Sequence, residues 1–237
     1  MTSAGRVGVV FVSHSERIAE GLVELARQMA PTVSLHAAGG TDDGRIGTSF
    51  DRVTTAITEA DSGAGVVVLC DLGSAILTAE TALDFLDDEQ RERVRIVDAP
   101  LVEGGVAASV AAEAGDPLDV VVRAAESARG SVSASGSAAA EAPAAPVGAP
   151  PITAHSRRIT LTNADGLHAR PAAELVKLAS MFPQRVTVNG TDAKSLLSIM
   201  SLGLVKGDEV EIASGDPDGA AAVEAIAELA ASGFGEA

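Results

Sequence analysis

The chain contains no tryptophan and no tyrosine, and aromatic residues make up only 2% of its 237 residues. Base stacking on aromatic side chains is therefore not an available way of binding nucleic acid. Lysine is absent from the first 151 residues, and the whole chain has 17 basic against 33 acidic residues, a formal net charge of −16. Because phosphate backbones and anionic membranes attract clustered cations, this balance argues against nucleic acid and membranes as partners.

Cysteine and long apolar runs are scarce too. The single cysteine, Cys70, excludes an intrachain disulfide and a zinc site built on several thiolates, and it fits a reducing compartment. The N-terminus shows no basic region followed by a cleavable apolar segment, and the longest apolar runs are too short to cross a bilayer. We therefore expect a soluble, cytoplasmic protein.

Composition changes sharply between residues 130 and 155, where alanine, proline, serine and glycine predominate. Such a segment has almost nothing large to bury and cannot offset its ordering entropy. The predicted organisation is therefore one domain over residues 1–129, a flexible linker over 130–155 and a second domain over 156–237.

The first domain alternates apolar runs with helical patterns. One amphipathic stretch ends at Met29 and places Ile18, Leu22 and Leu25 at helical spacing, which predicts that they face the core. The expected strands are residues 7–12, 33–36, 66–70 and 94–97, and the later expected helices are residues 49–60, 74–86, 106–114 and one that Asp116 and Pro117 open. Strands separated by helices predict an α/β fold, a doubly wound parallel sheet covered on both faces.

The second domain has a different rhythm. Its expected strands are residues 159–161, 185–188 and 210–213, and its expected helices are residues 170–181, 195–202 and 219–231. The dipeptide Asn189-Gly190 is a strong hairpin signal. Together these patterns predict a small α+β domain, an antiparallel sheet with helices on one face.

A histidine follows the first strand of the first domain. His14 stands before a helix start, where backbone N–H groups and the helix dipole stabilise an anion, so a phosphoryl group on its ring would be stabilised there. Asp71 ends a neighbouring buried strand and could orient this imidazole. Both residues also have a structural interpretation as helix caps, with Ser13 and Ser15 as further cap donors, and the residues alone leave the two interpretations open.

The second domain also places a histidine at a helix start. His168 is followed by Arg170, whose guanidinium suits a phosphate, and by Pro171 in the first turn. A capping histidine beside a solvated arginine is the structural alternative. The remaining candidates favour structural roles: Asp42 and Asp43 a solvated turn rather than a metal site, Cys70 a core position, His36 a strand end and His155 the linker.

The segment Gly166-Leu-His-Ala-Arg-Pro-Ala172 resembles the active-site signature of the phosphocarrier protein HPr of the bacterial phosphotransferase system. The resemblance continues to the C-terminus and implies an open-faced β-sandwich. It also implies a phosphohistidine at His168, with Ala169 and Arg170 stabilising the phosphate. Ser195 matches a position that some HPr proteins phosphorylate for regulation, although capping of the following helix is sufficient to explain it.

The first domain is similar to the mannose-type IIA fold, and within it to the phosphoryl-donor subunit of phosphotransferase-dependent dihydroxyacetone kinase. The resemblance rests on segments such as Val10-Phe-Val-Ser-His-Ser15 and Asp71-Leu-Gly-Ser-Ala75. A sugar-transporting IIA usually has Gly-Gly-Ser-Pro after the aspartate, so the sequence here favours the dihydroxyacetone branch. The resemblance implies phosphorylation of His14, orientation by Asp71 and a homodimer formed through this domain.

Together the two resemblances imply a phosphotransferase that relays phosphate from enzyme I through His168 and His14. The expected partners are enzyme I, HPr and the ADP-binding and dihydroxyacetone-binding subunits of the kinase. No cofactor or metal is expected on this chain itself, since ADP and Mg belong to the partner kinase subunit. The longest family members add a piece of enzyme I that this chain lacks, so a separate enzyme I is expected to load the relay. Alternatives are a component of mannose-type sugar uptake and a signalling module read through its phosphorylation state.

Overall fold

The computed structural model describes residues 5–129, 155–164 and 166–235. Contacts between residues divide the chain into two compact units, Met1–Arg129 and Gly130–Ala237. Most of the predicted linker lies outside the described residues. Its last residue, His155, is instead the first residue of a strand, because its backbone pairs with Ser214.

The first unit is built on a four-stranded parallel sheet with the order β2-β1-β3-β4. Its elements are β1 (Gly8–Ser13), α1 (Glu16–Arg27), β2 (Leu35–Gly39), α2 (Phe50–Ala60), β3 (Val66–Cys70), α3 (Gly73–Leu83), α4 (Asp88–Glu92), β4 (Val94–Val97), α5 (Leu101–Ala114) and α6 (Leu118–Glu126). The chain passes from β1 to β2 on one side and returns past β1 to β3 on the other. The strand order therefore reverses at β1, and ligand sites of open parallel sheets lie at the carboxyl end of that point.

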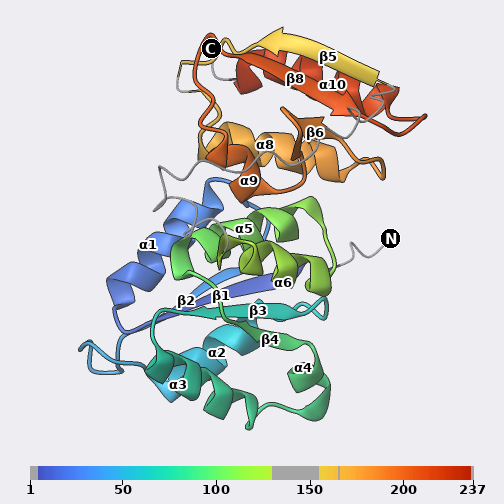
Figure 1. Ribbon diagram of the computed structural model, residues 1–237. Coiled ribbons are helices and arrows are strands. Elements are labelled where there is room, and N and C mark those ends of the chain that lie inside the picture. The colour runs from blue at the N-terminus through green and yellow to red at the C-terminus, as the bar shows by residue number, and fades with distance from the viewer. Residues whose placement is uncertain (1–4, 130–154, 165, 236–237) are drawn as a thin grey trace, which may run out of the picture. The chain divides into compact units, whose positions relative to one another are not determined.

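Helices cover both faces of this sheet (Figure 1). Alternate β1 residues contribute to two separate cores, because successive side chains of a strand point to opposite faces. Phe11 packs with α1, α5 and α6, whereas Val12 packs with α2 and α3. All six β1 residues are buried, which explains why this strand reads as a continuous apolar run.

Helix α1 differs from the predicted stripe. Its buried residues are Ala19, Leu22, Val23 and Ala26, whereas Ile18 is 50% and Leu25 is 42% exposed. The prediction for Ile18 and Leu25 was therefore wrong. The buried face of α1 includes Leu22, as expected, but it is centred on the positions of Ala19 and Ala26, so Ile18 and Leu25 lie outside it.

Three other helix boundaries also differ from the prediction. Helix α5 begins at Leu101 and runs through Gly104-Gly105. Glycine is needed at position 105, because a Cβ there would lie 2.3 Å from the Phe11 ring. The helix expected over residues 74–86 ends at Leu83, and α4 follows as a separate short helix. Helix α6 begins at Leu118, so Pro117 occupies the N-cap position and Asp116 lies before it.

The second unit carries an antiparallel sheet with the order β5-β8-β6-β7. Its elements are β5 (His155–Thr160), α8 (Ala169–Ser180), β6 (Thr187–Val188), β7 (Thr191–Asp192), α9 (Leu196–Ser201), β8 (Glu209–Ser214), α10 (Ala220–Ala231) and the 3-10 turn η1 (Gly233–Gly235). The predicted hairpin is confirmed: Asn189 and Gly190 have φ values of 48° and 81° between β6 and β7. Buried Leu175, Ile199, Ile212 and Ile226 fill the space between helices and sheet.

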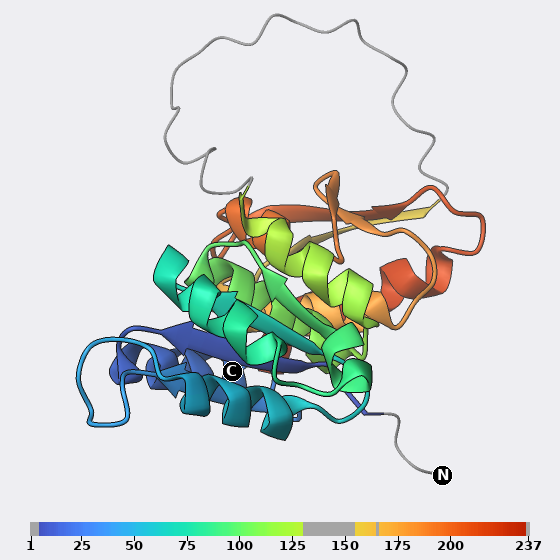
Figure 2. The ribbon, with the colours of Figure 1, turned by 90° about the horizontal axis from the view of Figure 1, so that it is seen from below.

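The segment between β2 and α2 extends beyond the end of the parallel sheet in both views (Figures 1 and 2). It leaves the carboxyl edge of the sheet, next to the end of β1. None of the described helices is both long and apolar enough to span a bilayer.

Candidate active site

His14 and Asp71 lie side by side at the carboxyl edge of the parallel sheet. Val12 pairs with Cys70 in the β1–β3 ladder, so the residues that follow these two strands are neighbours. The Asp71 backbone N–H also donates to the Val12 carbonyl at 3.1 Å. The fold therefore brings together two residues that are 57 positions apart in the sequence.

The Asp71 carboxylate holds both the backbone and the ring of His14. Its Oδ1 lies 2.9 Å from Nδ1 of the imidazole, and its Oδ2 accepts from the His14 backbone N–H at 2.8 Å. An ionised carboxylate only accepts hydrogen bonds, so Nδ1 must carry the proton. In the neutral ring this leaves a lone pair on Nε2, which makes Nε2 the nucleophilic nitrogen.

The electrostatics of the pair favour this protonation state. Burial alone would raise the pKa of Asp71, but hydrogen bonds from the His14 backbone and ring and from Ser13 outweigh it and hold the pKa below its usual value. The side chains of His14 and Asp71 are 21% and 17% exposed, respectively. The pair is thus shielded enough to be ordered and open enough for another molecule to reach the ring.

The prediction that the Ser13 and Ser15 side chains cap helix α1 was wrong. Ser15 occupies the N-cap position of α1, but its side chain makes no capping hydrogen bond. The Ser13 hydroxyl, fully buried, donates to Oδ2 of Asp71 at 2.9 Å and accepts from the Ser15 N–H at 3.1 Å. Ser13 therefore fixes the carboxylate, because that oxygen offers a stronger acceptor than a neutral group would.

Ser74 is a site residue that we did not predict from the sequence. Its Oγ lies 2.8 Å from Nε2 of His14, at the N-terminus of α3. Leu72 is the N-cap of α3, so Asp71 is not the cap, and this alternative for Asp71 is excluded. The sequence predicted a helix beginning at residue 74, but this did not specify which atom the Ser74 hydroxyl would contact.

The segment between β2 and α2 borders the His14 backbone. The Gly47 N–H donates to the His14 carbonyl at 2.9 Å, and the side chain of neighbouring Ile46 is exposed. Asp43 bonds Thr41 and Arg45 within the same turn. Among the described residues no group of histidine, cysteine or acidic side chains is arranged to hold a metal ion.

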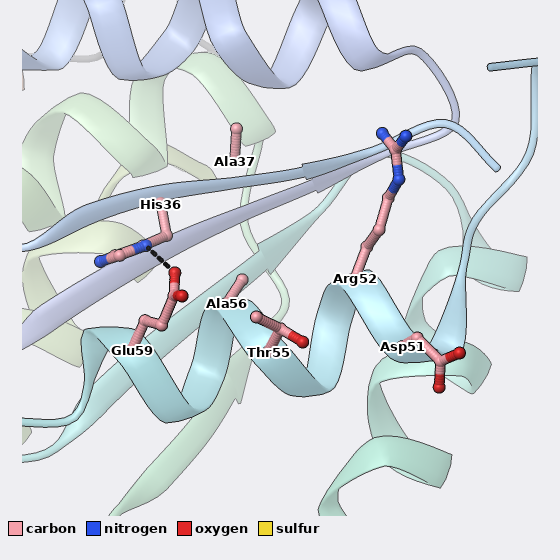
Figure 3. Close-up of a pocket in the computed structure, with 7 residues that line it drawn as sticks. All are labelled: His36, Ala37, Asp51, Arg52, Thr55, Ala56 and Glu59. Atoms are coloured by element: carbon pink, nitrogen blue, oxygen red, sulfur yellow. Dashed lines mark ion pairs between the residues drawn. The ribbon is translucent and has the colours of Figure 1, made fainter. Parts of the chain in front are cut away.

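A polar cleft of about 360 Å³ lies elsewhere, between β2 and α2 (Figure 3). His36, near the start of β2, pairs with Glu59 there at 3.4 Å. The Arg52 guanidinium points away from that pair and donates to Glu16 and to the Gly39 carbonyl, each at 2.7 Å. His14 does not line this cleft, so the cleft is separate from the His14 site.

His168 occupies the N-cap position of α8, in extended backbone conformation. Its carbonyl accepts from the Ala172 N–H at 3.0 Å, while its side chain is exposed and makes no capping hydrogen bond. Ala169 and Arg170 follow in the first helical turn, and the Arg170 side chain is also exposed. The prediction that His168 and Arg170 lie at the same end of one helix is therefore confirmed.

Ser195 is the N-cap residue of α9, but its hydroxyl does not bond a helix amide. It lies 2.8 Å from the Ser198 hydroxyl instead. The predicted cap is thus present in position and not in its side-chain bond. Cys70 is a core residue as predicted, and burial raises the pKa of its thiol to about 12.

Comparison with known proteins places both units. Residues 8–122 match the family described as the PTS system fructose IIA component, and residues 155–232 match the family described as the PTS HPr component phosphorylation site. The two units therefore define a chain assembled from two phosphotransferase-system components.

Individual relatives narrow this class. The phosphoryl donor subunit DhaM of PEP-dependent dihydroxyacetone kinase from Pantoea ananatis is 39% identical over 97% of this chain and 51% of the relative. A subunit of the same name from Listeria innocua is 46% identical over 44% of this chain and 84% of the relative. The phosphocarrier protein HPr of Vibrio cholerae is 42% identical over 32% of this chain and 93% of the relative.

The chain belongs to the family of phosphoryl donor subunits of dihydroxyacetone kinase. Some curated relatives align with nearly the whole of this chain, and the chain spans about half of their length.

Proposed function

We propose that the chain relays a phosphoryl group from enzyme I through His168 and then His14 to the ADP-bound subunit of dihydroxyacetone kinase. The observation that carries this proposal is the His14 ring, whose Nδ1 is held by Asp71 at 2.9 Å and whose Nε2 faces an open helix start at Ser74. The matches of the two units to a IIA component and to an HPr phosphorylation site support one phosphotransfer site in each unit.

Transfer to His14 needs only alignment and charge stabilisation. The lone pair on Nε2 attacks phosphorus, the bond between phosphorus and the His168 imidazole breaks, and that imidazole keeps the electron pair. The Asp71 carboxylate stabilises the positive charge that develops on the His14 ring. The Ser74 hydroxyl, released from Nε2, can donate to a phosphoryl oxygen, and the N-terminus of α3 favours the negative charge.

The onward step reverses this chemistry. The bond from phosphorus to Nε2 breaks while a terminal oxygen of ADP forms the new bond, so ATP is regenerated on the partner subunit. ADP and Mg are therefore placed on that subunit, and this chain needs no cofactor of its own. Exposed Ile46 and Leu72 flank the His14 site and offer apolar surface for the partner to contact.

The remaining assignments belong to the same proposal. We place His168, with Ala169 and Arg170, in an HPr-type open-faced β-sandwich, and the first unit in a doubly wound IIA-type domain that forms a homodimer. The relay would operate in the cytoplasm, which a buried free Cys70 is compatible with. Modification of Ser195 is not needed for the relay.

The test is reconstitution of the full chain with enzyme I, phosphoenolpyruvate and the two kinase subunits, with dihydroxyacetone phosphate as the measured product. His14→Ala should abolish product while His168 still becomes labelled. His168→Ala should lose product and recover it when free HPr is added. Full activity of His14→Ala would refute the proposed order. Labelling of His14 without formation of dihydroxyacetone phosphate would refute the proposed acceptor.

A further inference from the structure

The loop that leads to His168 contains a buried carboxamide, the side chain of Asn163. Asn163 is only 2% exposed, although it is in a loop between β5 and α8. Its Nδ2 donates to the Gly166 carbonyl oxygen at 2.6 Å. A polar side chain this deeply buried in a small unit is uncommon and is normally kept for the hydrogen bond that it makes.

The Gly166 carbonyl oxygen is shared with His168. The His168 backbone N–H donates to the same oxygen at 3.0 Å. A peptide oxygen has two lone pairs, so Asn163 and His168 together use its full capacity. One atom therefore links the buried carboxamide to the backbone of the histidine.

The opposite side of Gly166 is closed by packing. Gly166 has φ +67°, and a Cβ there would lie 2.3 Å from the Leu204 carbonyl oxygen and 2.6 Å from Cα of Val205. The next residue, Leu167, donates its N–H to the same Leu204 oxygen at 2.9 Å. The loop is thus held by backbone contacts on one side and by the Asn163 side chain on the other.

The oxygen of the Asn163 carboxamide opposes folding. Asn163 Oδ1 is buried and has no hydrogen-bond partner among the residues that the structure describes. Leaving a buried acceptor unpaired opposes folding, and an apolar side chain of similar volume would avoid this cost. What the asparagine supplies beyond an apolar residue is therefore its N–H donor toward Gly166.

We propose that Asn163 is a positioning residue for His168. The Asn163 Nδ2 donor fixes the Gly166 carbonyl, and this carbonyl fixes the His168 backbone at the N-terminus of α8. The position of the imidazole relative to an incoming phosphoryl group is thereby restricted. The expected effect of Asn163 on the rate of phosphoryl transfer rests on the proposed function. The effect of Asn163 on the backbone geometry of His168 can be tested independently. Because Asn163 is buried and bonds the backbone of Gly166, its loss should slow the chemical step and leave the affinity for enzyme I unchanged.

The test uses Asn163→Leu in the full chain with His14→Ala, so that only His168 takes label. A second variant, Asn163→Asp, has the same shape and replaces the donor by an acceptor. Ser214→Ala is the matched control, because Ser214 is also 2% exposed in this unit and donates to a backbone carbonyl, that of Arg185, at 2.7 Å. Folding of every variant is checked from the dispersion of its amide NMR spectrum.

Two measurements follow for each variant. In labelling by enzyme I and phosphoenolpyruvate, Asn163→Leu and Asn163→Asp should lower kcat about tenfold or more with KM unchanged, since small misplacements of reacting groups cost this much. The NMR coupling through the hydrogen bond from the His168 nitrogen to the Gly166 carbonyl carbon should weaken or vanish. Ser214→Ala should keep the coupling and stay within twofold in kcat.

Each outcome decides the inference. Folded Asn163 variants with wild-type kcat and wild-type coupling would overturn it. Unfolding of the second unit in both variants would overturn it as well, in favour of a purely structural asparagine. If the unaltered chain takes no label at His168, the proposed function fails, whereas the coupling measurement still tests the placement of His168 by Asn163.

Discussion

Replacing Asp71 by asparagine tests whether the carboxylate sets the tautomer of His14. The asparagine oxygen can take the place of Oδ2, accepting from the His14 backbone and from Ser13 as Asp71 does. Its NH2 group then faces Nδ1 of His14. The favoured ring would carry its proton on Nε2, which removes the lone pair that attacks phosphorus.

The magnitude follows from the bonds involved. To react, the variant ring must place its proton back on Nδ1, opposite a second donor. This forfeits a hydrogen bond to a charged group, worth about 1.5–3 kcal/mol, and leaves a partly buried donor unpaired at about 1–3 kcal/mol. The sum of about 2.5–6 kcal/mol corresponds to transfer slower by roughly 10²- to 10⁴-fold.

The assay is rapid-quench labelling of the full chain by enzyme I and phosphoenolpyruvate, with label on His14 and His168 measured separately. His168 serves as an internal standard. Asp61→Asn is the control. The Asp61 side chain is also shielded from solvent, at 4% exposed, but Asp61 precedes β3, whereas Asp71 follows β3. Labelling of His14 in Asp71→Asn within fivefold of the unaltered chain would refute the role of the carboxylate.

Three further predictions concern the first unit. Ser74→Ala should slow labelling of His14 about 10- to 100-fold in the same assay, since it removes a donor to the phosphoryl group; an unchanged rate would argue against that contact. Gly105→Ala should lower stability in calorimetry by about 1–3 kcal/mol through overpacking, whereas Gly21→Ala, in an open part of α1, should raise it by about 0.5–1 kcal/mol; equal effects would contradict the packing. Burial opposes ionisation of Asp61, but the hydrogen bond and charge of Arg93, together with hydrogen bonds from Gly63 and Gln90, outweigh burial and hold the pKa of Asp61 below 3.8. Its stabilisation is therefore complete above pH 3.8 and is lost as pH falls through the lowered pKa, so calorimetric melting of Asp61→Asn should differ from the unaltered chain at pH 7 and converge with it in acid.

Much of the fold could be predicted from local pattern. Strands β1 and β3 are buried on both faces, so their sequences are continuous apolar runs that allow little else. The turn at Asn189-Gly190 requires positive φ, which these residue types tolerate. Helix ends were harder, because Gly104-Gly105 resembles a helix breaker until Phe11 is seen packed against it.

The apolar face of α1 could not be predicted for a related reason. Hydrophobicity favours Ile18 and Leu25 as core residues, but the buried face of α1 is centred on the smaller Ala19 and Ala26. Which apolar residues are buried depends on how the helix is rotated against the sheet, and a one-dimensional pattern does not contain that rotation.

The sequence by itself indicated His14 and His168 as candidates for phosphoryl chemistry, because a histidine at a helix start, with a carboxylate or an arginine near it, is a local chemical feature. Only the tertiary structure decided which atoms these groups contact. It set the proton of His14 on Nδ1 by bringing in Asp71, placed the Ser74 hydroxyl on Nε2, and connected Asn163 to His168 through one carbonyl oxygen. Hydrogen bonds depend on tenths of an ångström and on direction, and those quantities exist only after distant segments have packed together.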